Sequence, residues 1–147
     1  MPDNLTVTVG KFTFTVAPDR WYTPQGVWAK EEGTRIRVGL SDFLQQRSGD
    51  IAFVGVEPAG TILGLGEEFS SIETIKVDIA LSAPVSGKVV LVNPALEASP
   101  EVINRDPYGE GWFCEVEPAD WGTDRPRLLD AAAYFDKMKR EAEEEAR

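Results

Sequence analysis

A lysine lies between two runs of alternating apolar and polar residues, and this arrangement constrains the fold more than any other part of the chain. Apolar and polar side chains alternate over residues 69–74 and again over residues 77–81, with the period of two that is typical of half-buried β-strands. Only Ile75 and Lys76 separate the two runs. The sequence therefore predicts a hairpin with Lys76 at its tip. Taken alone, a lysine in a turn is most often a solvated surface charge.

Much of the remaining chain also favours short β-strands. Segments of this kind, bounded by Gly, Pro or Asn-Pro, cover residues 5–9, 12–16, 35–40, 51–56, 61–65, 88–92 and 112–116. Ser41 is expected to cap a short helix that reaches Arg47 and ends at Gly49, because its hydroxyl can accept a bond from a free backbone N–H. A second helix is expected after Asp130, where apolar residues recur at spacings of three and four. It is predicted to lie across the sheets.

Residues 60–66 and 87–93 form a weak internal repeat, in which apolar residues align with apolar residues. The repeat predicts two similar sheet-forming units that pack face to face. The sequence thus indicates a mainly β fold. We expect a sandwich of two antiparallel sheets with a short inserted helix and a C-terminal α-helix.

Charge and composition disfavour several functions. The 147 residues carry a formal net charge of −10 and include no histidine, so nucleic acid and anionic membrane, which both require a cationic surface, are poor partners. The absence of histidine also removes the commonest general base, which argues against an enzyme. Cys114 is the single cysteine and is expected to be a small core residue, not a reactive thiol. Without a signal-peptide region or an apolar run of membrane-spanning length, a cytoplasmic protein is expected.

The residues around Lys76 resemble two segments of the glycine cleavage H protein family. Residues 73–77 (Glu-Thr-Ile-Lys-Val) are similar to the family's Glu-Ser-Val-Lys-Ala, and residues 83–87 (Ala-Pro-Val-Ser-Gly) to its Ala-Pro-Val-Ser-Gly-Glu. Further similar blocks follow in the family's order and spacing, at residues 22–28, 38–43, 49–54, 58–60, 92–96 and 99–112. The resemblance implies a lipoyl-domain-like sandwich, or barrel-sandwich hybrid, with lipoate in amide linkage on Lys76.

The resemblance also implies an organisation and a set of partners. The chain is expected to form a single lipoyl-carrier domain, with added N-terminal strands (1–20), a lipoyl-domain core (21–125) and a C-terminal helix (126–147). A lipoate ligase or lipoyl transferase would attach the arm, and Glu73, near the tip, is a candidate for recognition by that ligase. Tethering would raise the effective concentration of the dithiolane at each docked partner. Dihydrolipoamide dehydrogenase is one implied partner.

The cargo is a separate question, because the chain departs from the family pattern. Gly26, Val27 and Ala80 stand where the family has His, Glu and Asp. A basic aminomethyl cargo needs carboxylate partners, so the departure favours a sulfur cargo, carried for a heterodisulfide-reductase-like complex in sulfur oxidation. One alternative is a glycine cleavage H protein in which Asp78 or Glu31 substitutes, serving a glycine decarboxylase and an aminomethyltransferase. A non-lipoylated interaction module is the other alternative.

Overall fold

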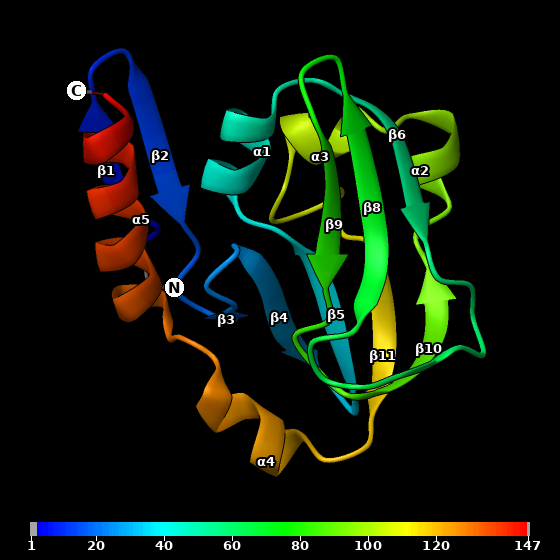
Figure 1. Ribbon diagram of the computed structural model, residues 1–147. Helices are drawn as coiled ribbons and strands as arrows, with labels where there is room; N and C mark the ends of the chain where they lie inside the picture. The colour runs from blue at the N-terminus through cyan, green and yellow to red at the C-terminus, as the bar shows by residue number, and fades with distance from the viewer. Residues whose placement is uncertain (1–2, 147) are drawn as a thin grey trace.

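Two antiparallel sheets face each other, and a separate two-stranded hairpin lies beside them (Figure 1). The computed structural model describes residues 3–146. The larger sheet has the strand order β3 (Trp21–Tyr22), β4 (Val27–Glu32), β5 (Arg35–Leu40), β11 (Cys114–Pro118), β10 (Gly87–Val92), β7 (Ile62–Leu63). The smaller sheet has the order β6 (Ile51–Val56), β8 (Glu68–Thr74), β9 (Asp78–Ser82). The predicted mainly β sandwich is confirmed, with the hairpin of β1 (Leu5–Val9) and β2 (Phe12–Val16) as a third sheet.

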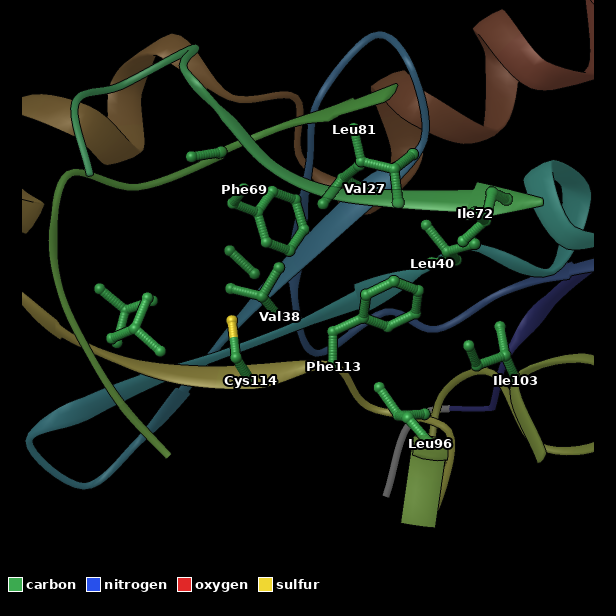
Figure 2. Packing of buried hydrophobic residues seen from close by; sticks show 14 of the residues in the cluster. Val27, Val38, Leu40, Phe69, Ile72, Leu81, Leu96, Ile103, Phe113 and Cys114 are labelled. Atoms are coloured by element: carbon green, nitrogen blue, oxygen red, sulfur yellow. The ribbon is translucent and has the colours of Figure 1, made fainter. Parts of the chain in front are cut away.

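The core forms where apolar side chains of the two larger sheets meet (Figure 2). Phe69 and Ile72 of β8 and Leu81 of β9 are each at most 1% exposed. Phe69 and Ile72 are three residues apart, and both reach the core because the register of β8 shifts between Glu68 and Ser70. The rings of Phe69 and Phe113 lie 6.2 Å apart and join the two layers. Burial of large apolar side chains of this kind is the main contribution to the stability of the sandwich.

Cys114 lies inside this core, with 0% of its surface exposed. Burial, with a smaller contribution from the neighbouring carboxylate of Glu115, raises the pKa of the Cys114 thiol to about 12. The thiol is therefore protonated and shielded at neutral pH, and the prediction of a small core residue is confirmed.

The inserted helix α1 (Asp42–Ser48) has the predicted ends. The hydroxyl of Ser41 accepts a bond from the Leu44 N–H at 3.2 Å, and Gly49 ends the helix with φ of 88°. Short helices that the sequence does not clearly indicate connect the later strands: α2 (Ala95–Ala98), α3 (Val102–Arg105), α4 (Trp121–Asp124) and the 3₁₀ turn η1 (Arg125–Arg127).

The two copies of the internal repeat are arranged differently from the prediction. Leu63 of β7 pairs with Gly87 of β10, so the two copies are hydrogen-bonded neighbours in one sheet. The prediction that they pack face to face is wrong, because similar apolar alternation suits adjacent strands of one sheet as well as strands of opposing sheets. Two strand limits also differ, since β7 is shorter than residues 61–65 and β11 begins two residues later than expected.

The C-terminal helix α5 (Ala131–Glu145) starts at the predicted cap, where the Asp130 carboxylate accepts the Ala133 N–H at 2.8 Å. It does not lie across the sandwich, however. It packs against β1, β2 and β3 (Figure 1) and shares a second apolar cluster with them, in which the rings of Tyr22 and Tyr134 stack 4.5 Å apart. The hairpin supplies apolar residues that cover one face of this helix.

Candidate functional site

Lys76 lies at the tip of the β8–β9 hairpin, as predicted. The Thr74 hydroxyl accepts the backbone N–H groups of Lys76 at 3.2 Å and of Val77 at 3.0 Å, and the Thr74 N–H donates to the Val77 carbonyl at 2.9 Å. Ile75 beside the lysine is 97% exposed. A turn closed by its own side chain therefore holds Lys76 away from the sandwich in a defined geometry.

The lysine side chain extends from the tip to the end of helix α1. Its Nζ donates to the backbone carbonyl of Arg47 at 3.3 Å. At Gly49 a Cβ atom would lie only 3.1 Å from the Lys76 Cε, and the positive φ of this residue also requires glycine. The end of α1 therefore leaves space along which the lysine side chain lies.

A pocket of about 300 Å³ opens directly beside Lys76. Apolar residues of the β1–β2 hairpin, of α1 and of α5 form much of its wall: Val9, Phe12, Phe14, Phe43 and Ala142. Arg47 and Glu145 also line it, and they form an ion pair at 2.5 Å. The pocket thus combines an apolar wall with one paired cation and carboxylate, a combination suited to an elongated, largely hydrocarbon group.

Two carboxylates flank the base of the turn. Glu73 of β8 is the cross-strand partner of Asp78 of β9, and both residues are exposed. Like charges directly opposite each other destabilise a strand pair, so this arrangement does not serve the stability of the hairpin. The structure places Glu73 near Lys76, while its part in recognition by a ligase stays a prediction.

The family departures at residues 26 and 27 have packing explanations. Val27 is fully buried in the core, where a carboxylate would be costly. Gly26 has φ of 107°, and a Cβ atom there would meet the Tyr134 hydroxyl at 2.8 Å and the Ser41 hydroxyl at 2.9 Å. Packing alone accounts for these two residues, so they give no support to a different cargo.

Gln25 and Ala80 are brought together although 55 positions separate them. The Gln25 amide donates to the Ala80 carbonyl at 2.8 Å and accepts the Ser82 N–H at 3.3 Å. Glu31, proposed as a substitute acid, instead accepts the indole N–H of Trp121 at 2.9 Å. Neither Glu31 nor Asp78 lines the pocket beside Lys76, whereas Glu145 does.

Sequence reasoning missed the pocket. Its wall is built from the hairpin and from the end of α5, and the pairing of Arg47 with the acids of this helix depends on how α5 docks. The sequence does show a basic residue, Arg47, at the end of α1 and two acids spaced by four, Glu141 and Glu145, in α5. This pattern does not indicate that the two helices meet.

A β-sandwich with an exposed lysine on a rigid hairpin tip is the architecture of carrier domains of the lipoyl type. A sequence model of the family described as glycine cleavage H-protein matches residues 20–141. The chain belongs to this family. Its members carry lipoate covalently on a lysine and act as carriers, not as enzymes.

Relatives with this description span most of the chain. The glycine cleavage system H protein of Thermus thermophilus is 40% identical over 127 residues, which cover 86% of this chain and 98% of the relative. That of Bacteroides fragilis is 45% identical over 113 residues, or 77% and 89% of the two chains. The crystal structure of the H protein from Mycobacterium marinum superimposes with a TM-score of 0.76 at 32% identity, covering 83% of this chain and 98% of that one.

Among residues 3–146, no helix has both the length and the apolar character needed to cross a membrane.

Proposed function

We propose that Lys76 carries the lipoyl arm and that the protein is the H component of a glycine cleavage system. The observation that carries this proposal is the position of Lys76, which lies on a closed turn beside an apolar pocket, within the part of the chain that matches the family. The alternative function, a non-lipoylated interaction module, does not account for a lysine placed beside this pocket.

The residues around Lys76 fit a lipoyl group. The pocket's apolar wall suits a hydrocarbon chain, and an acylated Nζ would retain one N–H, which can still donate to the Arg47 carbonyl now bound by Lys76. When bound, lipoate supplies a dithiolane that accepts a group and two electrons. Thr74 holds the attachment point, and Phe12, Phe14 and Phe43 can exclude water from the stem of the arm.

Attachment requires another enzyme, since the described residues place no general base against Nζ: its hydrogen-bond partner is a backbone carbonyl. A lipoate ligase or lipoyl transferase must enclose the tip. Glu73 and Asp78 offer this enzyme two carboxylates that are not engaged in salt bridges with the described residues. A basic patch on the modifying enzyme would complement them.

Glycine cleavage is the better supported pathway. The similar proteins are glycine cleavage system H proteins, and the packing of Gly26 and Val27 removes the main argument for a sulfur cargo and a heterodisulfide-reductase-like partner. Glu145 places a carboxylate at the pocket, where it is paired with Arg47. A basic aminomethyl group would compete with this arginine for the carboxylate. The partners in this proposal are glycine decarboxylase, aminomethyltransferase and dihydrolipoamide dehydrogenase. A reducing cytoplasm suits the single buried thiol.

Lipoylation at Lys76 is tested by intact mass. After co-expression with a lipoate ligase, the unaltered chain is expected to gain the mass of one lipoyl group, and Lys76→Arg is expected to gain none, because a guanidinium keeps the charge but is not acylated. Lys88→Arg, on the exposed side of β10, is the matched control and should be modified normally. A lipoyl gain in Lys76→Arg would remove the attachment site from the proposal.

The pathway is tested by reconstitution. The lipoylated chain, mixed with glycine decarboxylase, aminomethyltransferase, dihydrolipoamide dehydrogenase and tetrahydrofolate, is expected to support glycine-dependent reduction of NAD at a rate similar to that of an ordinary H protein. Direct reduction of the arm by dihydrolipoamide dehydrogenase is measured in parallel, because it needs access to the dithiolane alone. Normal reduction of the arm without glycine turnover would show a working carrier of a different cargo.

A further inference from the structure

The outer edge of β1 presents backbone groups without partners. Val9 and Phe12 flank the two-residue turn of the β1–β2 hairpin, so they form a hydrogen-bonded pair, and the alternation along the strand directs the N–H and C=O groups of Thr6 and Thr8 away from β2. Within residues 3–146, no hydrogen bond engages these four groups. They form a short row of free donors and acceptors.

The opposite edge of the same hairpin is covered. The Gln46 amide donates to the Thr13 carbonyl at 2.9 Å, and the Asp42 carboxylate accepts the Thr15 N–H at 2.9 Å. The Tyr108 hydroxyl donates to the Thr15 carbonyl at 2.7 Å. One edge of the hairpin is thus closed by α1 and Tyr108, while the β1 edge lies on the side of the hairpin away from α1 (Figure 1).

β1 also lacks the usual protection of an edge strand. Its sequence, Leu-Thr-Val-Thr-Val, includes no charge and no proline, and its pairing with β2 has no bulge. Its apolar face remains partly open: Leu5, Val7 and Val9 are half-buried. Of their partners on β2, Val16 and Phe14 are 0% and 7% exposed, whereas Phe12 is 58% exposed. Both the backbone edge and the apolar face are therefore incompletely covered in one copy of the chain.

We propose that β1 pairs antiparallel with β1 of a second copy, about a two-fold axis at Val7. The strand is self-complementary about this residue: Leu5 of one copy faces Val9 of the other, and Thr6 faces Thr8. Apolar residues then meet on the α5 face and threonines on the opposite face. The outward groups of Thr6 and Thr8 form four backbone hydrogen bonds, and the interface is isologous, as a two-fold dimer requires.

The surface area buried in this contact limits the strength of the dimer. The contact consists of five residues from each strand, with the half-buried Phe135 of α5 nearby. The area that it buries is below the ~1,200 Å² typical of stable complexes. The dimer is therefore weak and depends on concentration. Because each copy carries a formal charge of −10, added salt screens the repulsion and strengthens the association.

Sedimentation equilibrium over a range of protein concentrations tests the proposal. The average mass of the full chain is expected to rise from one towards two chain masses. Thr6→Lys combined with Thr8→Lys sets lysines opposite each other at both threonine pairs, and should lower the association constant about tenfold or more. The matched variant, Thr6→Lys with Thr8→Glu, sets opposite charges face to face and should retain the dimer at the same salt concentration.

Amide hydrogen exchange gives an independent readout in the unaltered chain. The amides of Thr6 and Thr8 should become protected as the concentration rises, while those of Val7 and Val9, which bond to β2 within one copy, should not change. Circular dichroism of each variant confirms that it is folded. A chain that stays monomeric at millimolar concentration, equal association of the two double variants, or unprotected Thr6 and Thr8 amides in a dimer would each overturn the proposal.

Discussion

Val89→Asp is expected to unfold the protein or to lower its free energy of unfolding by about 4 kcal/mol or more. Val89 is 0% exposed and faces Val116 across the β10–β11 pair. Its backbone is also fixed, since its N–H donates to the Thr61 carbonyl at 2.9 Å and its carbonyl accepts the Gly60 N–H at 2.7 Å. The strand cannot turn the new carboxylate towards water, so an unpaired charge would remain in the core.

Urea unfolding followed by circular dichroism measures this effect. Leu91→Asp is the matched control, because Leu91 lies on the same strand but is 41% exposed; its cost should stay within about 1 kcal/mol. Lys76→Ala at the exposed tip should change stability by no more than about 0.5 kcal/mol. A cost for Val89→Asp similar to that for Leu91→Asp would mean that β10 presents the opposite face to the core.

Gly26→His, which introduces the residue typical of the family, is expected to destabilise this chain by about 2–4 kcal/mol. Steric overlap with the hydroxyls of Tyr134 and Ser41 contributes ~1–3 kcal/mol, and the left-handed backbone adds ~1 kcal/mol. The overlap also disturbs the 2.8 Å hydrogen bond between these two hydroxyls, which ties α5 to the start of α1. Thermal or urea unfolding of the purified variant provides the measurement.

Gly33→His separates the two contributions. Gly33 also has a positive φ, of 63°, but an added Cβ meets no atom within 4 Å. This control therefore carries the backbone penalty without the overlap and should cost about 1 kcal/mol. Equal losses at both positions would show that α5 does not occupy the space beside Gly26.

The parts of the fold that were predicted correctly depend on local chemistry. Alternation over residues 69–81 fixes the Lys76 hairpin, and Ser41, Gly49 and Asp130 determine helix ends through bonds to residues close in the sequence. The errors concern contacts between distant segments. The repeat at residues 60–66 and 87–93 does not reveal whether its copies share a sheet, and the apolar stripe of α5 does not reveal that the N-terminal hairpin covers it.

The candidate site shows the same division. The position of Lys76 at the tip follows from residues next to it in the sequence, while a role for Glu73 stays a prediction. The pocket does not follow from the sequence, because its wall joins β1 and β2 with α1 and with the distant α5. The surroundings of Gly26 also depend on a distant segment, because the sequence alone does not show that Tyr134 of α5 docks beside it.

The burial of Cys114 matters for a protein that carries a dithiolane. A thiolate near the arm would attack its disulfide and trap it as a mixed disulfide, since exchange requires an accessible, ionised sulfur. Cys114 is neither accessible nor ionised at neutral pH. The only redox-active sulfur atoms on the loaded carrier would then be those of the arm, so a thiol-specific label applied to the reduced, folded protein should mark the arm and leave the polypeptide unmarked.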